Sequence, residues 1–102
     1  MQVHVHDTLK EHNGNRQEFV TKTIEESLER FHPSIQRVDA SLTEDGHTPT
    51  TLEYHCKLSA NVGGLGVVAS DSKCGSVHEA VTSSVEKLVR GIEHRIGQHR
   101  AK

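Results

Sequence analysis

Four segments of the chain alternate apolar and polar residues at the period of two that a half-buried β-strand requires. They cover residues 2–6, 35–44, 51–60 and 65–69, and the third alternates over its whole length. Asp45-Gly46 is a turn signal after the second segment, and a glycine-rich turn precedes the fourth. This pattern predicts that the last three strands form a meander with one apolar and one polar face.

An apolar stripe with a residue every three or four positions predicts a helix between the first and second strands. Its members are Val20, Ile24, Leu28 and Phe31. Asn15, with Glu18 three residues later, is typical of an N-cap with its reciprocal partner. His32-Pro33 predicts the end of this helix, because the residue before a proline is disfavoured in the α region.

The strongest helical signal follows the fourth strand. Ser76 and Glu79 form a capping box, and a long apolar stripe comes after it. The stripe consists of Val77, Ala80, Val81, Ser84, Val85, Leu88, Ile92 and Ile96. We expect the helix to fray near Gly97 and to leave residues 98–102 as a flexible polar tail of a single domain, 1–102.

The order β-α-β-β-β-α predicts an α+β fold, with a four-stranded, mostly antiparallel sheet and two helices packed on one face. The chain has 102 residues, which is one domain, and no apolar run of the roughly 20 residues that a membrane span needs. With no signal-peptide pattern at the N-terminus, we expect a cytoplasmic protein. Only 3 % of residues are aromatic, which argues against a base-stacking platform for single-stranded RNA.

Charge is unevenly distributed. The net charge of −2 is the sum of two unlike parts: residues 1–72 carry six basic and eleven acidic residues, and residues 73–102 carry six basic and three acidic ones. The last helix is therefore the basic element of the chain, although the whole chain gives no reason to expect a polyanionic partner.

Lys87, Arg90 and His94 are spaced by three and four residues, so they form one ridge on the last helix. Arg95 and Arg100 follow near its end, and such a ridge suits contacts with nucleic-acid phosphates. The alternative is that these residues only solvate the outer side of an amphipathic helix and complement its dipole. Protonation of His94 and His99 would add charge, so we expect tighter RNA binding at pH 6 than at pH 8.

Other candidate chemistry is weaker. His4, His6 and His55 would share the polar face of the sheet, but no fourth ligand is placed to complete a zinc site, so we expect no metal and no cofactor. Cys56 is predicted to be a buried thiol and Cys74 a bystander. A glycine-rich turn at 63–66 lacks the residues of a phosphate-binding loop, which favours a simple hairpin. No acid–base or nucleophile pair is present, so we do not expect an enzyme or a small-molecule substrate.

The chain as a whole resembles the ribosome hibernation promoting factor family, also described as ribosome-associated inhibitors or sigma-54 modulation proteins. The resemblance is carried by the opening Met1-Gln2-Val3-His4-Val5, by Phe19-Val20, and by the last helix with Val77-His78-Glu79-Ala80-Val81 and Glu86-Lys87-Leu88-Val89-Arg90.

This resemblance implies a fold related to double-stranded RNA-binding domains and a non-enzymatic role in stress or stationary phase. Family members bind the small ribosomal subunit in the channel for mRNA and tRNA and stop translation. The candidate RNA-binding residues are Lys87, Arg90, His94, Arg95, Lys73, Arg100, Lys22 and Arg16. The chain departs from the family at Thr23 and Glu26, where basic residues are common, and it has no long C-terminal extension for dimerisation; dimerisation by another route is possible but not predicted.

Two other functions remain open. The β-β-β-α portion with its terminal basic helix is also typical of a stand-alone module for double-stranded RNA. The acidic first helix favours a third possibility, a protein-interaction domain that has lost RNA affinity.

Overall fold

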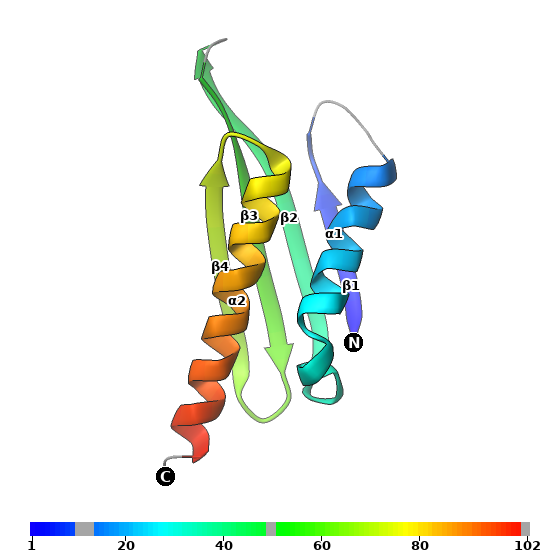
Figure 1. Cartoon of the computed structure of the whole chain (residues 1–102), viewed down its shortest axis with the longest axis vertical. Helices are drawn as coiled ribbons and strands as arrows, with labels where there is room; N and C mark the ends of the chain where they lie inside the picture. The colour runs from blue at the N-terminus through cyan, green and yellow to red at the C-terminus, as the bar shows by residue number, and fades with distance from the viewer. Residues whose placement is uncertain (10–13, 49–50, 101–102) are drawn as a thin grey trace.

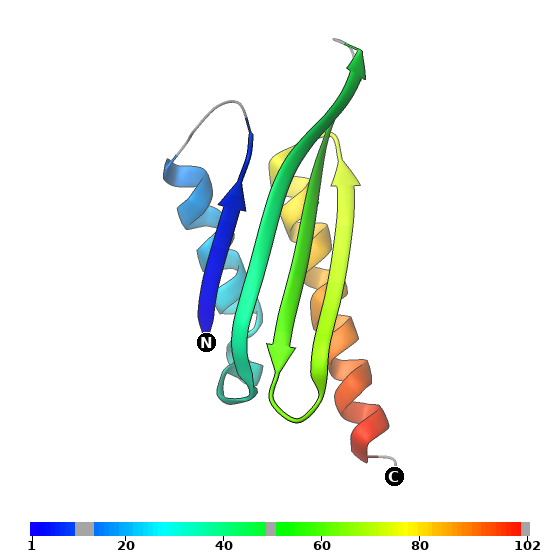
Figure 2. The ribbon, with the colours of Figure 1, turned by 180° about the vertical axis from the view of Figure 1, so that it is seen from behind.

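The computed structural model describes residues 1–9, 14–48 and 51–100 of the chain. The elements are β1 (Gln2–Asp7), α1 (Gly14–Ser27), the 3₁₀ helix η1 (Glu29–Ser34), β2 (Ile35–Thr48), β3 (Thr51–Val62), β4 (Gly66–Cys74) and α2 (Val77–Arg100). Both α-helices cover the same face of the sheet (Figure 1). The opposite face carries no helix (Figure 2).

The sheet has the order β1-β2-β3-β4. β1 runs parallel to β2, whereas β2, β3 and β4 form an antiparallel meander. The predicted α+β fold, with its β-α-β-β-β-α order and mostly antiparallel sheet, is therefore confirmed. The crossover through α1 is the reason for the parallel pair, because a helix must return the chain to the same end of the sheet.

The core lies between the helices and the sheet. Residues at alternate positions of the strands and at helical spacing on α1 and α2 fill it, as the sequence pattern predicts. Its largest fully buried members are Ile24, Leu28, Leu42, Leu58, Leu88 and Ile92. The other face of the sheet is mostly polar, apart from Val67 and Ala69 on β4, so the two-sided strand pattern has the expected orientation.

The first helix differs from the prediction at both ends. α1 begins at Gly14, so Asn15 lies inside it and is not its N-cap. α1 ends at Ser27, where Leu28 still donates to the Ile24 carbonyl but Phe31 donates to that of Leu28. The backbone thus tightens into η1, which accommodates Pro33 because a short 3₁₀ turn tolerates the missing donor.

Asp45-Gly46 is not a turn. β2 continues through both residues to Thr48 and pairs with β3 as far as Thr51, with a register shift between Gly46 and Thr48. The prediction was wrong because a glycine inside a strand more often marks such an irregularity than a reversal of the chain. The turn before β4 is confirmed, since Gly64 and Gly66 adopt φ of 80° and 86°, a conformation that L side chains rarely adopt.

α2 is capped as predicted, with the Glu79 N–H donating to Ser76 Oγ at 3.2 Å. It lies close to β4 at Gly91, where a Cβ atom would come within 2.9 Å of Val68 Cγ1. It also continues through Gly97 to Arg100, where we had expected it to fray. Of the helices in the described ranges, none is long and apolar enough to cross a membrane.

Candidate nucleic-acid interface

One flank of α2 faces α1, and its polar side chains are paired there. The His78 ring stacks on the Phe19 ring of α1, with centroids 4.8 Å apart. Near the other end of α1, Arg30 of η1 forms an ion pair with Glu93 and also lies over the ring of Phe31. This contact neutralises the cation that η1 brings towards α2.

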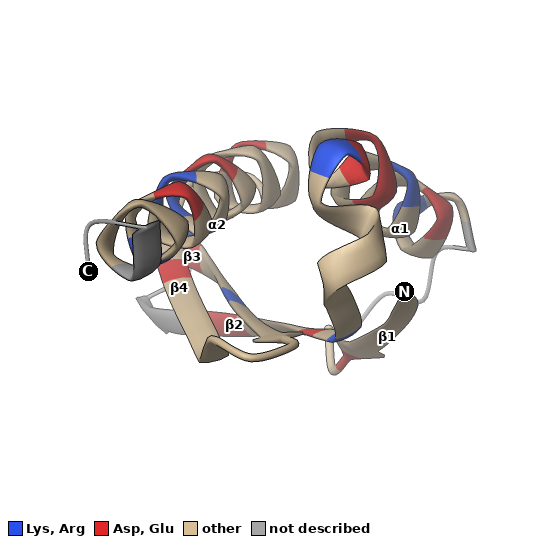
Figure 3. Cartoon of the chain, turned by 90° about the horizontal axis from the view of Figure 1, so that it is seen from below, with Lys and Arg blue, Asp and Glu red and all other residues tan. Residues whose placement is uncertain are grey.

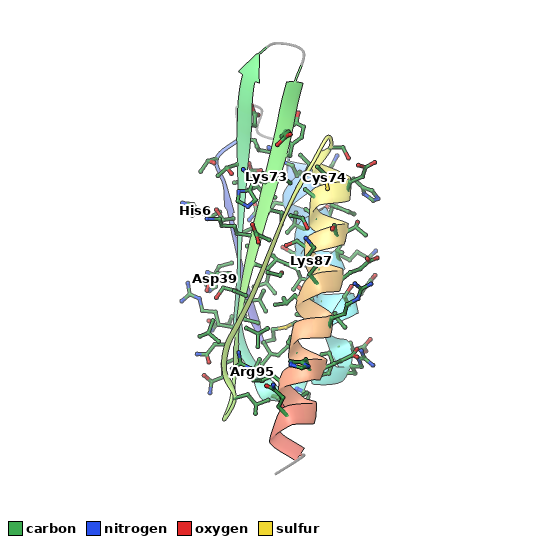
Figure 4. All side chains as sticks on the ribbon, turned by 90° about the vertical axis from the view of Figure 1, so that its left-hand side faces the viewer. His6, Asp39, Lys73, Cys74, Lys87 and Arg95 are labelled. Carbon is green, nitrogen blue, oxygen red and sulfur yellow. The ribbon has the colours of Figure 1, made fainter. Side chains whose placement is uncertain are left out.

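The opposite flank of α2 faces β4. Lys87 Nζ donates to the backbone oxygen of Asp71 at 3.1 Å, and Arg95 Nη1 donates to that of Leu65 at 2.8 Å. Figure 4 looks onto this side of the molecule, with Lys87 and Arg95 on α2 beside β4. Two of the predicted site residues are thus held in place by the backbone of β4 and of the turn before it.

Arg90 and His94 follow Lys87 round α2 towards its solvent-exposed side. They follow Lys87 by three and seven residues in an unbroken helix, so the three side chains share one side of it. Both Arg90 and His94 are exposed, and among the described side chains neither has a recorded ion pair. We call Lys87, Arg90, His94 and Arg95 the β4 flank of α2.

Lys73 approaches the same edge from the other face of the sheet. It is exposed near the end of β4, where it pairs with His55 of β3. In Figure 4 it lies on the β4 side of the molecule with Lys87. The structure therefore gathers five of the eight predicted residues around β4 and α2.

The remaining predicted residues lie elsewhere or are not described. Arg16 Nε is 2.8 Å from Asp7 Oδ2, and the Arg16 side chain is only 14 % exposed. This ion pair links α1 to β1. Lys22 is exposed on α1, with Nζ 4.0 Å from Glu26 Oε1. The side chain of Arg100 lies outside the described part of the chain.

The outer surface of the helix layer has mixed charge. Blue and red positions alternate along both helices in Figure 3, and neither helix shows a uniformly basic side. α1 carries Arg16 and Lys22 against Glu18, Glu25 and Glu26. The helix layer as a whole is therefore a poor phosphate surface, and the β4 flank is the part of α2 without an acidic partner from α1.

One carboxylate does lie beside the β4 flank. His55 Nε2 is 3.0 Å from Asp71 Oδ2, and this hydrogen bond is the largest cause that lowers the pKa of Asp71. The charges of His55, Lys87 and Lys57 lower it further, whereas desolvation opposes them. Asp71 therefore stays ionised at neutral pH and limits how positive this edge becomes.

The sequence patterns did not identify the groups that hold Lys87 and Arg95 in place. Lys87 and Arg95 contact backbone oxygens 16 and 30 residues away, and any residue type can supply a backbone oxygen. No residue pattern could have identified Leu65 and Asp71 as those partners. Lys57 was also missed, because its nearness to Asp71 depends on the β3–β4 register.

The thiols and imidazoles of the described residues form no metal-binding cluster. Cys56 is fully buried, and burial raises the pKa of its thiol to about 11, despite a hydrogen bond from Ser84 that lowers it. This confirms the predicted buried thiol. His4 and His6 lie opposite Asp39 and Ser41 on the open sheet face, and within the described residues no group of three or more His, Cys, Asp or Glu could hold a metal ion.

Comparison with known families covers almost the whole chain. The sequence profile described as "Sigma 54 modulation protein / S30EA ribosomal protein" matches residues 2–100. The chain belongs to this family. Its members are ribosome-associated modulators of translation and not enzymes. The resemblance noted from the residues is thereby confirmed.

Two solved structures share the fold. A ribosomal subunit interface protein from Coxiella burnetii is 11 % identical, with a TM-score of 0.68 over all of both chains. The N-terminal domain of Thermus thermophilus Protein Y is 13 % identical, with a TM-score of 0.71 over 91 % of this chain and 93 % of that one. At such identities the likeness concerns the fold. No curated protein matches the chain.

Proposed function

We propose that this protein is a hibernation factor that binds the small ribosomal subunit in the channel for mRNA and tRNA and thereby inhibits translation in stress or stationary phase. The contacts to ribosomal RNA phosphates come from the β4 flank of α2, together with Lys73. Family membership and the two fold relatives support a ribosomal partner.

The contrast between the two flanks of α2 supports the proposal that the phosphate contacts come from the β4 flank. Arg30 is neutralised by Glu93 on the side of α1. Lys87 and Arg95, by contrast, donate to uncharged backbone oxygens, and neither forms an ion pair among the described residues, although the charge of Lys87 also interacts with Asp71. A guanidinium or ammonium group with donors to spare can still bind a phosphate oxygen. Arg90 and His94 extend this row, so phosphates can be met along about two turns of the helix.

The test is co-sedimentation of the protein with ribosomes at low and high salt. The double charge reversal Lys87→Glu/Arg90→Glu should abolish most binding at low salt, because it replaces two attractive contacts with two repulsive ones. For the wild type, each phosphate contact should add about one to the slope of log affinity against log salt.

Lys22→Glu is the matched control, since it reverses one exposed charge on α1 and should leave binding nearly unchanged. Binding of the protein to plain duplex RNA is measured for comparison. Equal binding of duplex RNA and ribosomes would favour a stand-alone double-stranded RNA module, and binding that is insensitive to both salt and the double reversal would contradict the phosphate mechanism.

A further inference from the structure

β4 is an edge strand. It pairs with β3 over its whole length, from Gly66 to Cys74, without a register shift, and it is the last strand of the sheet. A long, regular edge presents unpaired N–H and C=O groups to any other strand and is a template for pairing between chains.

The outward groups of this edge can be identified. In an antiparallel ladder the N–H and C=O of one residue point to the same side, and the side alternates from residue to residue. The Asp71 carbonyl accepts Lys87 and therefore points away from β3. Val67 and Ala69 share its parity, so their backbone groups also point outwards.

A hydrophobic residue lies on the same stretch. Val67 is 56 % exposed and is the one large hydrophobic side chain that is exposed in the described part of the chain. An uncovered edge beside an exposed valine favours the addition of a strand.

We propose that Lys87 and Arg95 cap the β4 edge and keep it from pairing with the β4 edge of a second copy of this chain. Lys87 donates to the Asp71 carbonyl on the edge and Arg95 to the Leu65 carbonyl in the turn just before β4, so the two side chains enclose the open stretch between them. Charged side chains at sheet edges are a recognised means of preventing such pairing.

A second copy fits this edge because the strand is self-complementary. An antiparallel pairing centred on Val68 places Val67 of one copy beside Ala69 of the other, so apolar side chains meet on the open face. The same register sets Leu65 opposite Asp71. The carbonyls that Arg95 and Lys87 occupy are therefore those that a longer ladder between the two copies would need.

The test is the mass of the purified protein by sedimentation equilibrium, with no RNA present, so its outcome is independent of the proposed function. Lys87→Ala/Arg95→Ala should double the weight-average mass at a concentration where the wild type is monomeric. Adding Ala69→Pro should return the mass to that of the monomer. Proline removes an outward N–H without breaking the ladder to β3.

Arg90→Ala/Lys22→Ala is the control, because it removes two exposed positive charges but neither of the hydrogen bonds that Lys87 and Arg95 donate, and it should remain monomeric. The far-ultraviolet circular dichroism spectrum confirms that each variant folds. The proposal is overturned if the uncapped variant stays monomeric, if the control associates equally, if Ala69→Pro does not reverse the association, or if the wild type already pairs through β4.

Discussion

The two flanks of α2 differ both in the residues that they carry and in what lies opposite them. Towards α1, a histidine stacks on an aromatic ring and an arginine meets a glutamate. Towards β4, a lysine and an arginine donate to backbone oxygens, although the charge of Lys87 also interacts with the Asp71 carboxylate. The first flank joins the helices through paired groups, whereas no cation of the second forms an ion pair among the described residues.

This difference shows that a count of charges on a helix does not locate a phosphate-binding surface. What matters is whether the neighbouring element supplies a carboxylate or a carbonyl. A carbonyl orients a cation without cancelling its charge, so Lys87 and Arg95 are already ordered for the RNA contact that we propose. Ordering in advance lowers the entropic cost of binding.

The largest expected effect on stability comes from truncating a buried side chain of α2. Ile92 is fully buried, so Ile92→Ala should destabilise the fold by about 2–5 kcal/mol through lost burial and a cavity. Urea unfolding measures this change. Arg90→Ala, on the exposed side of the same helix, should change stability by less than about 0.5 kcal/mol. If the two variants have equal effects, α2 does not pack as described.

A smaller effect is expected at the ion pair between Arg30 and Glu93. Its side chains are 61 % and 50 % exposed, so solvent screens the pair. A double-mutant cycle with Arg30→Ala and Glu93→Ala should give a coupling of about 0.5 kcal/mol or less. The coupling should decline at high salt. A coupling that is indifferent to salt would show that the pair contributes through packing instead of charge.

The smallest effect concerns Asp71 and appears only in acid. Because the folded state lowers the pKa of Asp71 below 3.8, its contribution to stability is present above that pH and is lost as the pH falls through the folded value. Asp71→Asn should therefore flatten the decline of the melting temperature as the pH falls below about 4.

His55→Ala should reproduce this flattening, because His55 is the main cause of the shift. If the melting temperature of both variants declines in acid as it does in the wild type, the His55–Asp71 hydrogen bond contributes nothing to stability in solution.

The sequence predicted the framework well because strand and helix periods are local properties. The alternation at 53–60 and the stripe from Val77 to Ile96 each placed their residues on the correct face. The errors came where local signals compete. The Asp45-Gly46 signal failed because cross-strand pairing kept the chain extended.

The candidate site was only partly predictable. Helical spacing correctly aligned Lys87, Arg90 and His94, because their geometry depends on one regular element. Spacing could not show which neighbour each flank faces, since that depends on tertiary packing. Arg16 is an example: its charge suggested a role in RNA binding. In the structure it lies beside Asp7, nine residues earlier in the sequence, and forms an ion pair with it.

The most direct measurement is ribosome affinity at one low salt concentration for Arg90→Glu and Lys22→Glu. Each variant reverses one exposed charge, one on the β4 flank and one on α1. Arg90→Glu should weaken binding by about tenfold or more and reduce the salt slope by about one or more, and Lys22→Glu should change neither. Equal losses in both variants, or a greater loss for Lys22→Glu, would contradict the assignment of RNA binding to the β4 flank of α2.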